Sequence, residues 1–218
     1  MTAQPKLQLA MDALELTKAF GPLAQVQETV DVIEVGTVLL LGEGLRAVRE
    51  VRALYPEATI LADARIAEAG SVLAPPCFEA GANWISCVAG ASLTTIAGVV
   101  AAAQQAGGQV QVELGEAYDP ARAAQWRDLG VQHVIVKRSR DRESAGDLTW
   151  GLLDLDRINE LAAMGFTVTV TGGIKAADLD VFAGAPVGVV IAGRSIMQAA
   201  DPRAAAAELK AAIGRVWP

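Results

Sequence analysis

Short apolar runs with the composition of β-strands recur along the whole chain, and stretches with helical spacing lie between them. Successive runs begin 21 to 34 residues apart, a spacing that suits one strand and one helix per repeat. The helical spacing is clearest where Leu45, Val48, Val51 and Leu54 fall on one stripe of a helix expected over 43–54. The expected strands are 7–12, 31–36, 59–64, 83–88, 109–114, 132–137, 166–171 and 187–193.

Eight such units in 218 residues predict a single (β/α)8 TIM-barrel domain over residues 1–218. No linker rich in Pro, Gly or Ser divides the chain. The alternative is a doubly wound open sheet, which usually has fewer units. That alternative lacks support because no G-x-G-x-x-G motif follows the first expected strand.

Charge and composition exclude several kinds of partner. The net charge is −7 and aromatic residues make up 5%, so the chain is a poor ligand for nucleic acid or anionic lipid. No apolar run approaches the roughly 20 residues of a membrane span, and the first residues lack the apolar core of a signal peptide. We therefore expect a soluble, cytoplasmic protein.

Polar residues close many of the expected strands. In a barrel these positions meet at one rim, where active sites lie. A single carboxylate of this kind often only caps the next helix, but four carboxylates at four strand ends repel one another unless a cation joins them. The residues concerned are Asp12, Glu34, Asp63, Glu113, Lys137 and Thr171. Of these, we expect Asp12, Glu113 and Thr171 to bind the substrate.

Two of these acids are candidate metal ligands. Glu34 and Asp63 have no histidine or thiolate beside them, and a hard oxygen site of this type favours Mg²⁺ over zinc. Such an ion could chelate a keto-alcohol and stabilise an enediolate.

Cations follow two of the same strands. Arg65 stands two residues after Asp63 and could stabilise an enediolate oxygen, or it could form only a surface ion pair with Glu68. The basic cluster 137–142 contains Lys137 and Arg140, and it is either a solvated loop or a source of substrate contacts and of the proton.

Glycines follow the last two strands and predict a phosphate site. Thr171, Gly172 and Gly173 end one run, and Gly193 and Arg194 follow the next. Glycines let backbone N–H groups approach an anion, the start of a following helix adds a favourable dipole, and Arg194 adds charge. Barrels often bind phosphate at these two loops.

Several segments resemble the 3-keto-L-gulonate-6-phosphate decarboxylase family of the orotidine-5′-monophosphate decarboxylase superfamily, whose sister is hexulose-6-phosphate synthase. The resemblance runs nearly end to end, and the last three segments are more similar to the decarboxylase branch than to the synthase. The segments are 7–12, 32–37, 43–49, 138–141, 164–173 and 191–196.

This resemblance implies a homodimeric barrel with Mg²⁺ on Glu34 and Asp63, and with Asp12 as an active-site acid near the catalytic cation. It also implies that Glu68 acts in the neighbouring subunit's site. The family motif Asp-x-Lys-x-x-Asp is Asp63-x-Arg65-x-x-Glu68 here, and Lys137 replaces a histidine.

The leading hypothesis is therefore a Mg²⁺-dependent decarboxylation of a phosphorylated keto-sugar acid through an enediolate. The best single candidate is conversion of 3-keto-L-gulonate 6-phosphate to L-xylulose 5-phosphate and CO₂. In this hypothesis Asp12 and the partner's Glu68 orient Arg65, and Lys137 or Arg140 delivers the proton. Two alternatives remain: aldol addition of formaldehyde to ribulose 5-phosphate, and a sugar-phosphate-binding protein without catalysis.

Overall fold

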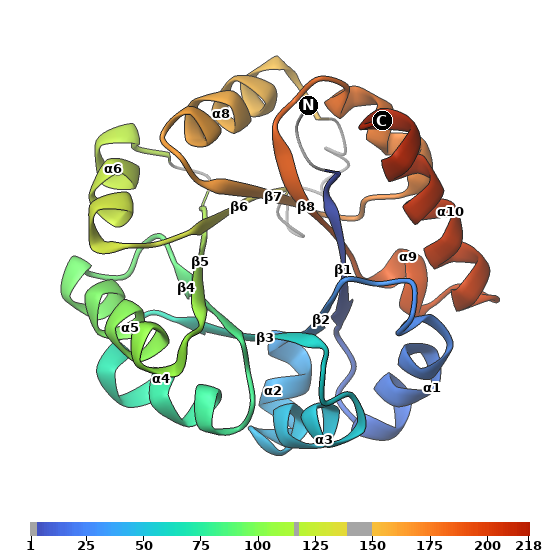
Figure 1. The fold of residues 1–218 in the computed structure, drawn as a ribbon, viewed down its shortest axis with the longest axis horizontal. Helices are drawn as coiled ribbons and strands as arrows, with labels where there is room; N and C mark the ends of the chain where they lie inside the picture. The colour runs from blue at the N-terminus through green and yellow to red at the C-terminus, as the bar shows by residue number, and fades with distance from the viewer. Residues whose placement is uncertain (1–3, 116–117, 139–149) are drawn as a thin grey trace.

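The computed structural model describes residues 4–115, 118–138 and 150–218. Eight parallel strands pair in chain order, and β8 pairs with β1 to close a barrel. Figure 1 looks along the barrel axis and shows the strands as an inner ring surrounded by helices. The strands are β1 (Lys6–Met11), β2 (Val32–Val35), β3 (Thr59–Ile66), β4 (Trp84–Val88), β5 (Gln109–Glu113), β6 (His133–Lys137), β7 (Thr167–Thr171) and β8 (Val187–Ala192).

The predicted TIM barrel is confirmed, and each expected strand is present within about two residues of its predicted ends. The helices are α1 (Leu16–Val26), α2 (Thr37–Glu43), α3 (Arg46–Leu54), α4 (Gly70–Glu79), α5 (Leu93–Ala106), α6 (Pro120–Leu129), α8 (Leu152–Ala163), the 3₁₀ helix η1 (Ala176–Phe182), α9 (Arg194–Met197) and α10 (Pro202–Val216).

The helix expected over 43–54 is wrong at its start. Helix α2 already ends at Glu43, and α3 begins only at Arg46. Gly44 separates them with a φ of +61°, a left-handed conformation that glycine adopts without steric cost. The apolar stripe belongs to α3, so its buried residues Val48 and Val51 still face the core.

Local signals define several helix ends. Asp119 and Asp201 accept hydrogen bonds from the first turns of α6 and α10, and a proline follows each as the first helical residue. Aspartate at the N-cap and proline directly after it are the preferred start of a helix. These caps fix where the crossover helices begin over the barrel.

Alternation along the strands creates two separate apolar regions. On β1, Leu7, Leu9 and Met11 are fully buried in the large cluster between strands and helices. Ala10 points the other way and packs with Ile135 and Ile191 inside the barrel. Because successive strand residues face opposite sides, these contacts identify the interior side chains of β1, β6 and β8.

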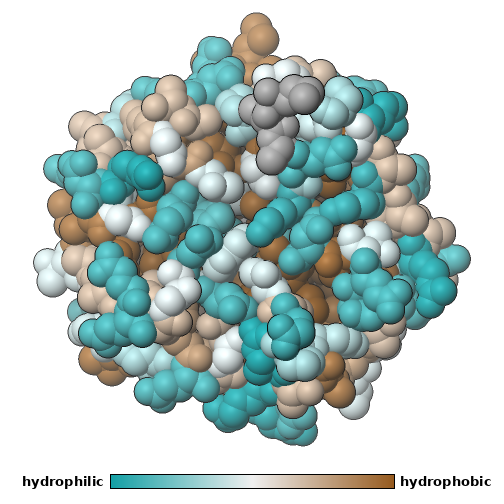
Figure 2. Space-filling model, in the orientation of Figure 1, coloured by the Kyte–Doolittle hydropathy of each residue, from teal (hydrophilic) through white to brown (hydrophobic). Residues whose placement is uncertain are grey.

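The outer surface is mixed. On the face shown in Figure 2, hydrophilic side chains separate the hydrophobic ones into small patches, as expected for a surface in contact with water. Within the described part of the chain, no helix is long and apolar enough to cross a membrane.

Candidate active site

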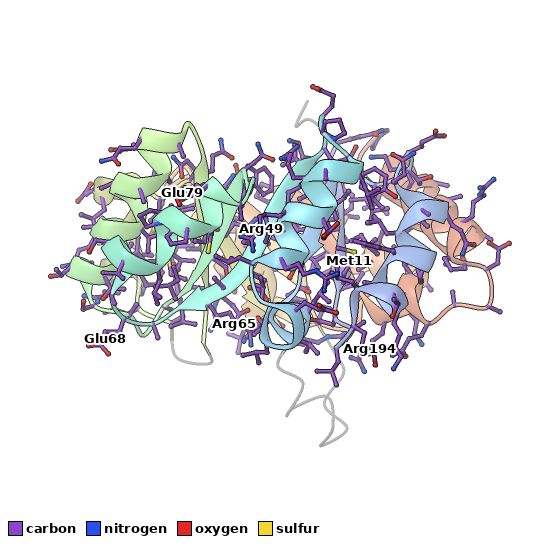
Figure 3. All side chains as sticks on the ribbon, turned by 90° about the horizontal axis from the view of Figure 1, so that it is seen from below. Met11, Arg49, Arg65, Glu68, Glu79 and Arg194 are labelled. Atoms are coloured by element: carbon purple, nitrogen blue, oxygen red, sulfur yellow. The ribbon has the colours of Figure 1, made fainter. Side chains whose placement is uncertain are left out.

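A cavity of about 390 Å³ opens at the carboxyl ends of the strands. Its volume lies in the range of small-molecule sites, and its position is the one that barrel enzymes use. Figure 3 shows Arg65 and Arg194 toward the same edge of the molecule. The predicted residues that line this cavity are Asp12, Glu34, Asp63, Arg65, Glu113, Lys137, Thr171, Gly172, Gly173, Gly193 and Arg194.

Asp63 is held by two hydroxyl groups. The Thr37 hydroxyl donates to Asp63 Oδ2 at 2.6 Å, and the Ser86 hydroxyl donates to Oδ1 at 2.7 Å. Burial raises the pKa of Asp63, although these hydrogen bonds and the nearby Arg65 oppose the shift. The carboxylate is therefore fixed in direction at the end of β3.

Glu34 lies beside Asp63 and, among the described residues, accepts fewer side-chain hydrogen bonds. Its Oε2 accepts a hydrogen bond of 2.7 Å from the side-chain amide of Gln8. Burial, followed by the negative charge of Asp63, raises the pKa of Glu34 well above its usual value. A buried carboxylate whose proton affinity is raised by a neighbouring carboxylate is an arrangement that a cation would stabilise.

The donor set of these two acids suits Mg²⁺ better than it suits a metal whose ligands all come from protein side chains. Across residues 4–115, 118–138 and 150–218, no three His, Cys, Asp or Glu side chains are grouped to hold a metal ion. Mg²⁺ is commonly held by one or two carboxylates and keeps several waters or substrate oxygens. Glu34 and Asp63 supply that kind of donor set.

Arg65 reaches the site through an irregularity in β3. The pairing of β3 with β4 shifts register between Ala62 and Ile66, and Arg65 adopts a φ of +45°, which is uncommon for a residue with a side chain. Its backbone N–H donates to Ser86 Oγ at 2.9 Å. Ser86 therefore joins the Arg65 backbone to the Asp63 carboxylate.

Glu113 holds both cations of this part of the site. The Arg65 guanidinium donates from Nε to Oε2 at 3.1 Å and from Nη2 to Oε1 at 2.6 Å. The Lys137 ammonium donates to the same Oε1. Burial lowers the pKa of Arg65, but the hydrogen bond and charge of Glu113 outweigh this and raise it overall. We predicted Glu113 as a substrate-binding residue, and here it orients two cations.

The two glycine loops are joined to each other and to the β6 end. Gly172 and Gly173 have φ of +115° and +66°, and the Arg138 guanidinium donates to the carbonyl oxygen of Gly172. The Ser195 hydroxyl donates to the carbonyl oxygen of Ile174 at 2.9 Å. These contacts fix the geometry of the predicted phosphate loops around Arg194.

The position of the Asp12 side chain depends on its close approach to the backbone of Gly36. A Cβ on Gly36 would lie 2.3 Å from Asp12 Oδ1, so only glycine at this position leaves room for the carboxylate. The glycine after β2 therefore allows Asp12 to occupy the rim beside Glu34.

Two predicted residues are not placed in the cavity. Glu68 is exposed and absent from the cavity lining, and Figure 3 shows it at the outer margin of the molecule. The alternative of a surface ion pair within the chain does not describe Arg65, which pairs with Glu113. Arg140 lies outside the described residues.

Three polar residues that support the carboxylates were not predicted from the sequence: Gln8, Thr37 and Ser86. Gln8 carried a usable signal, since it is a polar residue between Leu7 and Leu9 in an otherwise apolar strand. Ser86 and Thr37 carried none that separates them from ordinary strand-interior and helix-starting residues.

Comparison with known proteins identifies the family of the chain. The model of the "Orotidine 5'-phosphate decarboxylase / HUMPS family" matches residues 5–209. The chain is 46% identical over 213 residues to the 3-keto-L-gulonate-6-phosphate decarboxylase UlaD of Escherichia coli O17:K52:H18, covering 98% of each chain.

Solved structures give the same result. KGPDC from Streptococcus mutans in complex with D-R5P superposes with a TM-score of 0.95 at 39% identity, covering 98% of this chain and 99% of that one. The 3-hexulose-6-phosphate synthase from Salmonella typhimurium gives 0.89 at 32%, covering 96% and 99%. The chain therefore belongs to the orotidine 5′-phosphate decarboxylase / HUMPS family and is an enzyme, a lyase of carbon–carbon bonds.

Proposed function

We propose that this enzyme decarboxylates a phosphorylated 3-keto-sugar acid, with 3-keto-L-gulonate 6-phosphate as the best candidate and L-xylulose 5-phosphate and CO₂ as products. One observation carries the proposal. The buried acids Glu34 and Asp63, the cations on Glu113 and the glycine loops all line the same cavity. The names of the relatives at 46% and 39% identity support the same chemistry.

The chain's own residues divide the work. The loops of Gly172, Gly173 and Gly193, with Arg194, bind the phosphate. Glu34 and Asp63 would hold Mg²⁺, which when bound supplies a Lewis acid toward the substrate oxygens. Glu113 fixes the Arg65 guanidinium, which stays protonated and stabilises negative oxygen.

The bond changes balance without an oxidant or reductant. The bond between the carboxylate carbon and the adjacent sugar carbon breaks, and CO₂ leaves. The electron pair of the broken bond stays with the sugar carbon and moves toward the carbonyl oxygen, which gives an enediolate near Arg65. The sugar carbon then takes a proton, and the ketone re-forms. The Lys137 ammonium delivers this proton or orders the water that does, since it lines the cavity and is held by Glu113.

The test follows 3-keto-L-gulonate 6-phosphate by NMR in D₂O, with Mg²⁺ and with EDTA. We expect L-xylulose 5-phosphate only with Mg²⁺, and deuterium on one face of the new C–H bond. Asp63→Ala should abolish turnover, whereas Glu50→Gln on the surface of α3 is the matched control. Full activity in Asp63→Ala would refute the metal assignment, and no turnover by the folded wild type would refute the substrate.

The aldol reaction of formaldehyde with ribulose 5-phosphate is the second candidate, because the Salmonella typhimurium synthase has the same fold at 32% identity. Both reactions need a stabilised enediolate and a phosphate site. Formaldehyde consumption with ribulose 5-phosphate separates the two candidates.

We also propose that the enzyme is a homodimer in which Glu68 completes the partner's site. The exposure of Glu68 outside its own cavity supports this. Mixing inactive Asp63→Ala and Glu68→Gln proteins creates mixed dimers with one intact site. Because half of the dimers are mixed, about a quarter of wild-type activity should return, and no recovery after subunit exchange would contradict the shared site.

A further inference from the structure

A layer of buried polar side chains lies inside the barrel, directly beneath the cavity. Barrel interiors are filled by layers of four side chains from alternate strands. Glu113 and Thr171 line the cavity from β5 and β7, and Ala10 and Asp63 do so from β1 and β3. Two residues earlier on the same strands stand Gln8, Leu61, Gln111 and Thr169, which form the next layer of these four strands. We call Gln8, Gln111 and Thr169 the polar layer.

The polar layer is enclosed. Gln8, Gln111 and Thr169 each have a relative exposure of 0%, as does Leu61 beside them. Above them lie Ile135 and Ile191, which pack with Ala10. Below them, Val32 and Trp84 pack with Leu61. Bulk solvent therefore does not reach these polar groups.

Most of the hydrogen-bonding atoms in the polar layer have no protein partner. Gln8 Nε2 donates to Glu34 Oε2 at 2.7 Å. Among the described residues, however, Gln8 Oε1, Thr169 Oγ1 and both side-chain polar atoms of Gln111 have none. A buried polar atom left in this state destabilises a protein, and such atoms are almost always paired with protein or with ordered water.

His133 adds an acceptor next to this layer. It is the register partner of Gln111 across β5 and β6. Its Nε2 lies 2.7 Å from Gln109 Oε1, which assigns the proton to Nε2 and leaves Nδ1 as an acceptor. Nδ1 is also without a partner in the described chain.

The chemistry of these atoms selects one ligand. Gln8 Oε1, Gln111 Oε1 and His133 Nδ1 accept, Gln111 Nε2 donates, and Thr169 Oγ1 does both. Water matches such a mixed set because it donates two hydrogen bonds and accepts two, and an internal water typically makes about three. The set carries no charge that would hold an ion.

We propose that the polar layer is a binding site for ordered internal water, held by Gln8, Gln111 and Thr169. The water donates to Gln8 Oε1, so the amide is fixed with its Nε2 toward Glu34. The reversed amide would turn Oε1 toward the Glu34 carboxylate and leave Nε2 facing water. Gln8 is thus a positioning residue for Glu34, and the water is the group that orients Gln8.

The first test does not depend on the reaction. A crystal structure of the wild type should show ordered water within hydrogen-bond distance of Gln8 Oε1 and of Gln111 or Thr169. A direct bond between the Gln8 and Gln111 side chains, with no water between them, would overturn the proposal.

Thermal stability gives an independent test, because Gln111→Met should change Tm in opposite directions depending on whether the polar layer holds water (a wet layer) or none (a dry layer). In a wet layer, Gln111→Met breaks the water site and leaves Gln8 and Thr169 unpaired, so Tm falls by roughly 3 to 10 °C. In a dry layer, the same change removes two unpaired atoms, so Tm rises, and that result would refute the water site. Leu61→Met, a swap of similar volume in the same layer, is the control for repacking.

The positioning of Glu34 by Gln8 must be tested with a measurement that repacking of the barrel interior does not change. This test rests on the proposed metal site. Gln111→Met should raise the Kd for Mg²⁺, measured by calorimetry, about threefold to tenfold, and Leu61→Met should leave it unchanged. An unchanged Kd would refute the positioning role of Gln8. If the wild type binds no Mg²⁺, the proposed metal site fails, while the crystallographic and stability tests of the water stand unaffected.

Discussion

Ser86 joins Arg65 to Asp63 through a single hydroxyl group, and Ser86→Ala removes only that group. The hydroxyl accepts from the Arg65 backbone N–H at 2.9 Å and donates to Asp63 Oδ1 at 2.7 Å. Ser86 is fully buried, at 0% exposure, so bulk water cannot replace the lost partner. The substitution therefore leaves one donor and one acceptor unpaired at the same time.

The size of the effect follows from these two groups. A buried polar group left unpaired costs about 1–3 kcal/mol, and more when it is charged. Asp63 keeps its hydrogen bonds from Thr37, which limits the loss on that side. We therefore expect a loss of about 2–5 kcal/mol in unfolding free energy, or a fall in Tm of roughly 5 to 15 °C for a chain of this size.

Activity should fall as well, because the same hydroxyl helps to fix Arg65 in its positive-φ conformation. A small displacement of a group that binds the reacting atoms costs up to about 10²-fold in rate. Urea unfolding in EDTA measures stability, and kcat on the decarboxylation substrate measures the placement of Arg65. Ser86→Cys is the matched variant, since it keeps a weak donor and acceptor of similar size and should lie between the other two proteins. Stability within 0.5 kcal/mol of wild type, together with an unchanged kcat, would refute this account of Ser86.

Three further predictions test the loops and the buried titrating groups. Gly172→Ala should raise KM for the phosphorylated substrate far more than it changes kcat, because its φ is +115° and the new Cβ would lie 2.7 Å from the Arg138 carbonyl oxygen; an unchanged KM would show that this loop does not bind phosphate. Burial lowers the pKa of His133 from 6.5 to about 4, so its contribution to stability is complete above pH 6.5 and decreases by up to about 3 kcal/mol as the pH falls through 4. His133→Gln should flatten this acid limb in urea titrations, and an identical pH profile would contradict the assignment. Because the pKa values of Glu34 and Asp63 are raised, the metal-free protein loses stability as pH rises through those values; Mg²⁺ should therefore raise Tm more at pH 8 than at pH 5, and the reverse order would argue against this cation site.

The fold was accessible from sequence because its signal is repeated. Each strand carries the same pattern, so an error at one boundary changes nothing else. The error that did occur, at Gly44, arose because a glycine in a helical stretch can be tolerated or can end the helix. The spacing of Leu45, Val48 and Val51 is the same in both cases, and only the φ of Gly44 separates them.

The site was accessible in part. Residues at strand ends, such as Asp63 and Lys137, were found because the barrel brings all strand ends to one rim. Their partners were not, because pairing across the rim depends on side-chain direction. The ion pair of Arg65 with Glu113 links residues 48 apart in sequence and depends on the register shift in β3. No spacing rule predicts that the guanidinium turns toward β5 and away from Glu68.

The distribution of charge around the cavity then determines how a substrate can enter. On the β2–β3 side, the one hydrogen-bond donor to Glu34 among the described residues is an amide. Asp63 accepts from hydroxyl groups, and the Arg65 Nε lies 3.8 Å from Asp63. Arg65 and Lys137 are instead directed to Glu113. Within the described residues, the negative charge on this side is therefore only partly balanced, and it attracts a cation.

The β7–β8 side has the opposite character. Its glycine loops and Arg194 add no carboxylate to the cavity lining, so it suits an anion. A chain with a net charge of −7 repels anionic substrates at long range, so an anion is held only where such a local site exists. In the proposed function, a phosphorylated substrate therefore binds with its phosphate toward Arg194. That orientation would leave the other end of the substrate over Glu34 and Asp63, within reach of the two cations on Glu113, where a carboxylate separated by one carbon from a ketone would be released as CO₂.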